Sequence, residues 1–112
     1  MLDIHEVLRE LSMTAGPSGF EQTVAQRAAR LMMPYVDEVG TDALFNVFGI
    51  KRSKKGGARK LLFSAHLDEI GLMVTKIEDG FLRFRTIGGI DPRILPAKEI
   101  KVLTDPPVFG VI

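Results

Sequence analysis

The 112-residue sequence contains no cysteine and no tryptophan, has a single tyrosine, and carries almost no net charge. The absence of cysteine excludes disulfide bonds, thiolate metal sites and a cysteine nucleophile, and it fits a reducing compartment. The formal net charge of +1 gives no reason to expect nucleic acid or an anionic membrane as a partner. No apolar segment approaches the roughly 18 residues of a membrane span, and the first residues lack the pattern of a signal peptide. The sequence therefore predicts a cytoplasmic protein with no membrane and no nucleic-acid partner.

What the sequence does contain is an ordinary globular composition, with 46% hydrophobic and 26% charged residues. Its length suits one small domain rather than two. The sequence ends inside an apolar run, Gly110-Val111-Ile112, without a polar tail. Because natural domains seldom finish in the middle of a strand, we expect the chain to be part of a longer one.

The first third of the sequence predicts two amphipathic helices. Asp3 resembles the first residue of a capping box, and the glycine- and proline-containing segment 15–19 ends the first helix. Ser18 is followed three residues later by Glu21, which predicts that Ser18 caps the second helix, and Pro34 ends that helix. The two apolar stripes are Ile4, Val7, Leu8 and Leu11, and Phe20, Val24, Ala28, Leu31 and Met32.

After Pro34 the apolar period changes from helix-like to strand-like. An Asp-Gly pair at 79–80 predicts a tight hairpin turn. The basic run 52–60 lacks the Gly-Lys-Ser/Thr of a phosphate-binding loop, so a solvated turn is the better interpretation. A continuous apolar run at 61–65 predicts a strand buried on both faces, as in the middle of a mixed or parallel sheet. The other predicted strands are residues 36–41, 46–52, 70–77, 81–87, 100–103 and 108–112.

His66 and Asp68 follow the 61–65 run directly, at the strand end where open α/β sheets bind ligands. Residues two apart in an extended segment lie on the same side. An imidazole that binds a metal needs its other ring N–H held by an acceptor, commonly a carboxylate. Three-residue patterns also occur by chance, so the spacing alone favours a partly buried, hydrogen-bonded histidine over a metal ligand.

Three other polar residues have less specific interpretations. Glu69 beside Asp68 suggests an acid/base pair for glycoside hydrolysis, but neighbours on an extended chain point to opposite faces. Glu69 is therefore expected to be solvated or to support the site. His5 is expected on the surface of the first helix. Arg93 is expected either to contact an anionic group or to hold its own turn by bonding backbone carbonyls.

Five stretches of the sequence carry a resemblance, and the third is the most specific. They are residues 11–21, 41–47, 65–74 (Ala65-His66-Leu67-Asp68-Glu69-Ile70-Gly71-Leu72-Met73-Val74), 87–93 and 110–112. In this order they resemble the co-catalytic metallo-aminopeptidases that include glutamyl aminopeptidase, the tetrahedral aminopeptidases and proteins once labelled cellulase M. The resemblance covers essentially the whole chain.

The resemblance implies an α/β fold and a peptidase. Residues 1–69 would hold the N-terminal helices and strands of a mixed-sheet metallopeptidase domain, and residues 70–112 would begin a β-rich insertion domain used for assembly. His66 would be a terminal ligand to one of two adjacent divalent metal ions, zinc or cobalt. Asp68 would be the catalytic-site carboxylate that orients His66. The partners would be peptide substrates, cleaved at their N-terminal residue, and copies of the same chain in a homo-oligomer, often a dodecamer.

Two features depart from the family pattern. Phe45 stands where the family commonly has glycine. The bridging aspartate, the catalytic glutamate and the remaining metal ligands of the family lie beyond the position of Ile112, so the 112-residue chain alone is expected to be inactive. Two alternatives remain open: a stand-alone, non-catalytic β-rich assembly module, and a sugar hydrolase, for which the sequence lacks a suitable carboxylate pair.

Overall fold

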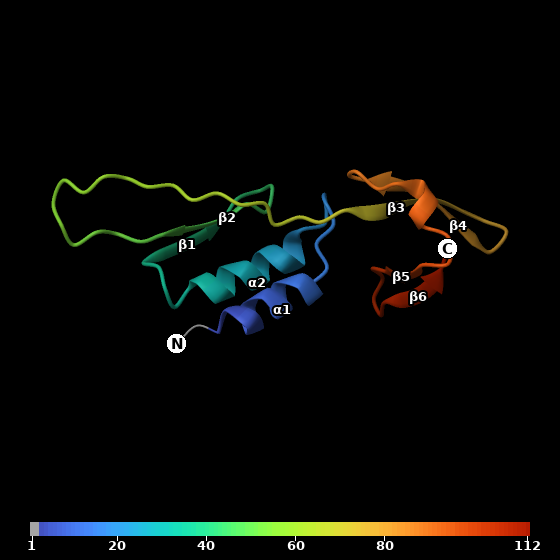
Figure 1. Cartoon of the computed structure of the whole chain (residues 1–112), viewed down its shortest axis with the longest axis horizontal. Helices are drawn as coiled ribbons and strands as arrows, with labels where there is room; N and C mark the ends of the chain where they lie inside the picture. The colour runs from blue at the N-terminus through green and yellow to red at the C-terminus, as the bar shows by residue number, and fades with distance from the viewer. Residues whose placement is uncertain (1–2) are drawn as a thin grey trace. The chain divides into compact units, whose positions relative to one another are not determined.

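A computed structural model describes residues 3–112, which divide into two compact units at the boundary between Glu69 and Ile70 (Figure 1). The first unit contains α1 (Ile4–Met13), α2 (Gln22–Met32), β1 (Glu38–Thr41) and β2 (Val47–Ile50). The second contains β3 (Gly71–Glu78), β4 (Phe81–Ile87), the short 3-10 helix η1 (Pro92–Ile94), β5 (Glu99–Val102) and β6 (Val108–Val111). The strands form three antiparallel pairs, β1–β2, β3–β4 and β5–β6. Both predicted helices and six of the predicted strands are thereby confirmed.

The start of α1 is capped as the sequence predicts. A carboxylate oxygen of Asp3 accepts hydrogen bonds from the backbone N–H groups of His5 at 2.9 Å and Glu6 at 3.4 Å. The first turn of a helix leaves such N–H groups without partners inside the helix. The Asp3 side chain therefore satisfies donors that α1 itself does not.

The predicted cap of α2 is wrong. The helix begins at Gln22, its N-cap residue is Glu21, and no side chain caps it. Ser18 instead donates its hydroxyl to the carboxylate of Asp68. A hydrogen bond to an ionised carboxylate is stronger than one to a backbone group, so the distant partner outweighs the local pattern.

The core of the first unit is small and lies on α2. Val24 is 2% exposed and Ala25 is 0% exposed, and within residues 3–112 these are the buried hydrophobic side chains. Helix α2 packs against α1 and against both strands of the β1–β2 pair. Burial of this one face of α2 therefore holds the elements of the first unit together.

The 42–46 loop that joins β1 to β2 is tightly bonded and contains backbone strain. The Asp42 carboxylate accepts from the backbone N–H groups of Leu44 and Asn46, both at 2.9 Å, and from the Asn46 side-chain amide at 2.8 Å. The bond from the Asn46 side chain is the main reason that the pKa of Asp42 is lowered. Phe45 has a φ of 62°, in the left-handed region that favours glycine. The positive φ therefore explains why glycine, which the resemblance leads us to expect at this position, suits it.

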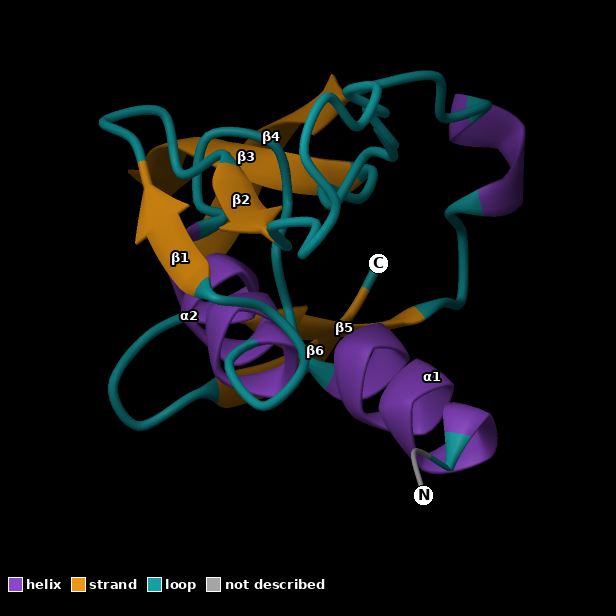
Figure 2. Cartoon of the chain, turned by 90° about the vertical axis from the view of Figure 1, so that its left-hand side faces the viewer, coloured by secondary structure: helices purple, strands orange, loops and turns teal. Residues whose placement is uncertain are grey.

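The buried strand predicted at 61–65 is not present. The segment between β2 and β3 contains neither helix nor strand, apart from an isolated bridge at Glu69 (Figure 2). Leu61, Leu62 and Phe63 are 81%, 91% and 91% exposed. A strand needs a neighbour that accepts and donates its backbone hydrogen bonds, and no strand of residues 3–112 pairs with this segment.

The expected mixed sheet is consequently not formed by the described residues. Antiparallel pairs take its place, and each joins strands that are neighbours in the sequence. The combination of helices and strands expected of an α/β fold is confirmed.

The β3–β4 hairpin turns at Asp79 and Gly80, as predicted. The two residues have φ values of 50° and 82°, and a type I′ turn requires positive φ at both positions. The pairing register shifts between Val74 and Lys76, which leaves Thr75 at a bulge. The turn residues therefore set where the chain reverses, and the bulge at Thr75 sets the pairing register of the two strands.

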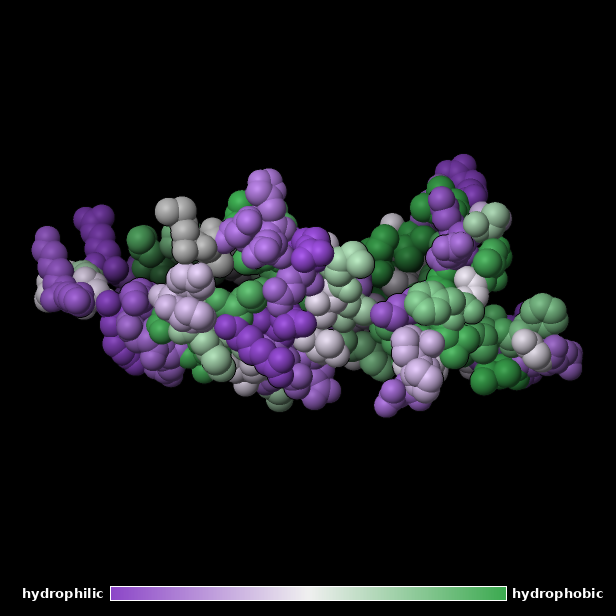
Figure 3. All heavy atoms as spheres, turned by 90° about the horizontal axis from the view of Figure 1, so that it is seen from below, coloured by the Kyte–Doolittle hydropathy of each residue, from purple (hydrophilic) through white to green (hydrophobic). Residues whose placement is uncertain are grey.

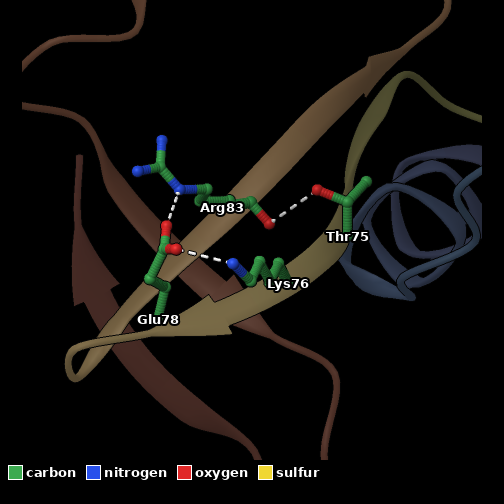
Figure 4. A network of polar contacts seen from close by, with 4 residues as sticks. All are labelled: Thr75, Lys76, Glu78 and Arg83. Atoms are coloured by element: carbon green, nitrogen blue, oxygen red, sulfur yellow. Dashed lines mark hydrogen bonds and ion pairs between the residues drawn. The ribbon is translucent and has the colours of Figure 1, made fainter.

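A network of polar contacts connects Thr75, Lys76, Glu78 and Arg83 in this hairpin (Figure 4). The Glu78 carboxylate accepts from Lys76 Nζ at 2.5 Å and also binds Arg83 Nε. The Thr75 hydroxyl donates to the carbonyl of Arg83 at 3.3 Å. The bonds from Lys76 and Arg83 lower the pKa of Glu78, the one from Lys76 most strongly.

No residue of the second unit is buried. Phe84 on β4 is half-buried, whereas Leu82 is 39% exposed, so the predicted buried face of β4 is only partly formed. Phe81 and Phe109 are 76% and 74% exposed. Figure 3 shows hydrophobic side chains lying open among polar ones on the face that it draws.

Residues 3–112 contain two α-helices, α1 and α2, and neither has the length and apolar character needed to cross a membrane.

Candidate metal centre

His66 lies at the end of the 61–65 segment, and its side chain is 87% exposed. Its Nδ1 atom is 2.9 Å from the backbone carbonyl oxygen of Asp68 and 3.5 Å from the Asp68 carboxylate Oδ1. A carbonyl and an ionised carboxylate can only accept hydrogen bonds, so a neutral His66 must carry its proton on Nδ1. Its Nε2 atom is then left with a free lone pair, which is the form of imidazole that binds a metal ion.

Asp68 connects His66 to Ser18. One carboxylate oxygen, Oδ1, faces His66, and the other, Oδ2, accepts the Ser18 hydroxyl hydrogen bond at 2.5 Å. This bond from Ser18 is the main cause that lowers the pKa of Asp68, and the interaction with His66 lowers it further. Asp68 is therefore ionised near neutral pH, with each oxygen directed at a different partner.

Glu69 binds the same loop, residues 16–18. Its backbone N–H donates to the Gly16 carbonyl at 3.0 Å, and its carbonyl accepts from the Ser18 N–H at 3.2 Å. Its side-chain Oε1 accepts from the Gly16 N–H at 2.9 Å. Glu69 is exposed, as expected of a solvated residue, and its carboxylate also supports the 16–18 loop. The carboxylates of Asp68 and Glu69 are both bonded to this loop, which gives no acid/base pair.

Packing against α2 fixes the 16–18 loop from a second side. Gly16 is buried, and a Cβ atom at this position would lie 2.3 Å from Cγ1 of Val24. Only glycine allows so close an approach to a buried side chain. The loop that binds Asp68 and Glu69 is therefore anchored to the core of the first unit.

The described residues do not complete a metal site. Among residues 3–112, no group of three His, Cys, Asp or Glu side chains lies close enough together to hold a metal ion. A catalytic zinc ion takes about three protein ligands. The chemistry of His66 fits one of those positions.

The other candidate residues are engaged elsewhere or exposed. His5 is exposed on α1, as expected. Arg93 holds its own turn, but it bonds a carboxylate and not the predicted carbonyls. Its Nη2 atom lies 2.7 Å from the Asp91 carboxylate, and its Nε contacts the same group. This pairing raises the pKa of Arg93 and lowers that of Asp91.

Ser18 belongs to the candidate site by its bond to Asp68, and the sequence did not indicate this contact. It lies 50 positions from Asp68, and its nearest pattern indicated a helix cap. The available signal was its position inside the 11–21 stretch, which carries part of the family resemblance.

Comparison with known proteins identifies the family. The profile of the M42 glutamyl aminopeptidase family matches residues 46–112, more than half of the chain, and this region includes both His66 and Asp68. The chain belongs to the M42 family. The co-catalytic metallo-aminopeptidase resemblance of the sequence is thereby confirmed.

Among curated M42 relatives, the lysyl aminopeptidase of Pyrococcus furiosus is 36% identical over 102 residues, which are 89% of this chain and 29% of that protein. The M42 chain thus spans less than a third of the length of this relative.

Solved structures agree with this assignment. A TET aminopeptidase from Thaumarchaeota archaeon SCGC AB-539-E09 is 35% identical with a TM-score of 0.85, covering 96% of this chain and 30% of that one. PhTET1-12s, described as a dodecamer, is 34% identical with a TM-score of 0.80, covering 98% and 33%. A Thermotoga maritima protein described as an endoglucanase is 46% identical with a TM-score of 0.75, covering 82% and 30%. The fold of the M42 chain is therefore that of the corresponding part of TET aminopeptidases.

Proposed function

We propose that this M42 chain is the N-terminal segment of a divalent-metal-dependent aminopeptidase that removes N-terminal residues from peptides. The observation that carries the proposal is the state of His66. Within the region matched by the family profile, Asp68 holds Nδ1 of His66 and leaves Nε2 open for a metal ion. Such an arrangement of imidazole and acceptor is typical of metal-binding histidines.

The proposed cofactors of the intact enzyme are two divalent metal ions, zinc or cobalt. His66 binds one of them through Nε2, and imidazole nitrogen is a favoured ligand of zinc. Asp68 keeps the His66 ring in the correct tautomer and orientation. When bound, such metal ions supply an activated water and polarise the substrate carbonyl near neutral pH.

The two units have different proposed roles. Residues 1–69 form the N-terminal part of the peptidase domain, because they contain His66, Asp68 and the loop that supports them. Residues 70–112 begin the β-rich insertion domain used for assembly, and the antiparallel hairpins and exposed hydrophobic side chains of this unit support that role. Because the described residues supply one metal ligand, the 112-residue chain by itself is inactive.

The proposed partners are peptide substrates and further copies of the same chain. PhTET1-12s, to which this chain is similar, is described as a dodecamer, and this supports a homo-oligomer. A cytoplasmic location remains a prediction that rests on the lack of cysteine.

Sugar hydrolysis is a second candidate because one similar structure is described as an endoglucanase. A retaining or inverting glycosidase needs two carboxyl groups that flank the scissile bond. The carboxylates of Asp68 and Glu69 are instead bonded to Ser18 and Gly16. The described residues therefore favour the peptidase.

The test is hydrolysis of aminoacyl nitroanilides by the intact protein, before and after treatment with a metal chelator. We expect activity that the chelator abolishes and that zinc or cobalt restores, with no activity in the 112-residue chain. Hydrolysis of soluble cellulose derivatives in place of aminoacyl substrates would sink the proposal. A defined oligomer with neither metal nor activity would favour the non-catalytic assembly module.

A further inference from the structure

Ser18 reaches the candidate metal centre from outside the region that the family profile matches. Its hydroxyl donates to Oδ2 of Asp68 at 2.5 Å, while Oδ1 of the same carboxylate lies 3.5 Å from Nδ1 of His66. Asp68 therefore lies between Ser18 and His66, with one carboxylate oxygen bonded to the hydroxyl and the other facing the imidazole.

The orientation of His66 depends on Asp68. The His66 side chain is 87% exposed, so it lacks the packing that fixes most side chains. The polar contacts of His66 within residues 3–112 are both with Asp68, at its carbonyl and at its carboxylate. A group that fixes the Asp68 side chain therefore fixes one of the two contacts that orient the imidazole.

The position of Ser18 does not depend on its hydroxyl. Its loop is held by backbone hydrogen bonds to Glu69 and by the Glu69 side chain. On the other side, buried Gly16 lies against Val24. Removal of the hydroxyl alone should leave the loop in place and release the carboxylate of Asp68.

We propose that Ser18 is a positioning residue for metal binding, which holds the Asp68 carboxylate so that its free oxygen faces His66. The inference rests on the proposed function, because it assigns Ser18 a role toward the metal that His66 binds. Under this proposal, the loop between α1 and α2 acts on the metal ion indirectly, through Asp68 and His66. Removal of groups that hydrogen-bond to metal ligands commonly changes metal affinity about 10-fold to 100-fold.

The test is the zinc affinity of the intact protein, measured by competition with a chelating dye. We expect Ser18→Ala to weaken zinc binding about tenfold, and Ser18→Thr, which keeps a hydroxyl, to restore most of it. Ser53→Ala is the matched control, because Ser53 lies in the exposed 52–60 loop. It should leave zinc affinity unchanged.

A double-mutant comparison separates positioning from a general loss of structure. If Ser18 acts through Asp68, Ser18→Ala should cause no further loss of affinity in an Asp68→Ala protein. An equal loss with and without Asp68, or no loss in the otherwise unchanged protein, overturns the inference. His66→Ala measured beside these variants tests the proposed function itself. Unchanged zinc binding there would overturn the assignment of His66 and, with it, the role of Ser18.

Discussion

The proton on His66 is placed by its neighbours and not by burial. Its Nδ1 atom faces two groups of Asp68 that can only accept hydrogen bonds, although the imidazole itself is largely exposed. An exposed histidine normally exchanges freely between its two neutral forms. Here the contacts with Asp68 select the form that leaves Nε2 free, which is the form that the proposed metal binding needs.

Because of backbone strain at Phe45, we expect the glycine variant at this position to be more stable than the alanine variant. At ordinary loop positions, alanine is more stabilising than glycine by about 0.4–1 kcal/mol. Because Phe45 has a φ of 62°, we expect Phe45→Gly to be more stable than Phe45→Ala by about 1 kcal/mol. Both variants lose the same aromatic ring, so the comparison isolates the backbone. Hydrogen exchange at the amides of β1 and β2 measures the difference, and a more stable alanine variant would show that Phe45 is unstrained.

The carboxylate of Asp42 predicts a pH dependence. Its pKa is lowered in the folded chain, chiefly by the Asn46 side chain, so its ionised form stabilises the fold. This contribution is fully present above the ordinary pKa of about 3.9 and is lost as the pH falls through the lower folded value. We expect Asp42→Asn to be less stable than the unchanged protein at neutral pH, with a smaller difference in strong acid. Urea denaturation at both pH values is the measurement, and a constant difference contradicts the account.

Sequence patterns indicated His66 and Asp68 as candidate site residues but did not indicate the contact of Asp68 with Ser18. The two residues are close in the sequence, and the geometry of an extended chain brings them together. Ser18 is distant in the sequence, and its contact with Asp68 depends on how the loop before α2 packs. A local pattern carries no information about such a contact, which explains why Ser18 was interpreted as a helix cap.

At the scale of elements, the stability of the β3–β4 hairpin depends on a turn residue that can adopt a positive φ. Gly80 has a φ of 82° in the β3–β4 turn, whereas Gly89 lies outside the left-handed region and has open space where a Cβ atom would lie. We expect Gly80→Ala to destabilise the hairpin by about 1 kcal/mol, and Gly89→Ala to have little effect, because an added Cβ there meets no atom within 4 Å. Hydrogen exchange at the amides of β3 and β4 gives the comparison. Equal protection in the two variants would mean that the turn tolerates a side chain.

The same scale shows where sequence prediction of strands succeeds and where it fails. The β3–β4 pair was predicted correctly because its partners are joined by a two-residue turn, so the information is local. The 61–65 run was wrongly predicted as a buried strand. Its apolar character indicates burial, but burial requires partner strands that residues 3–112 do not contain.

At the scale of the whole molecule, the described residues contain one proposed metal ligand and no complete metal site. The chain spans about 30% of the TET aminopeptidase to which it is similar, and it offers His66 but no group of three metal ligands among residues 3–112. The exposed side chains of Leu61, Leu62 and Phe63 adjoin this ligand in the sequence. Both features agree with the proposed function, in which the sheet and the metal centre need residues that this chain does not contain.

The 112-residue chain should therefore bind zinc weakly. A single histidine with a supporting carboxylate gives too few ligands for tight binding. Isothermal titration calorimetry should show at most a weak, incompletely saturated signal for the chain, and His66→Ala should remove most of it. Tight one-to-one binding of zinc would contradict the proposed incomplete site.

The most direct test of the central claim is the metal content of the intact protein, measured by mass spectrometry of the bound metals. His66→Ala is compared with His5→Ala, because His5 is exposed on α1 and has no proposed role. The account predicts that His66→Ala loses one of two metal ions per subunit and most peptidase activity, while His5→Ala keeps both. Full metal content and full activity in His66→Ala would contradict it.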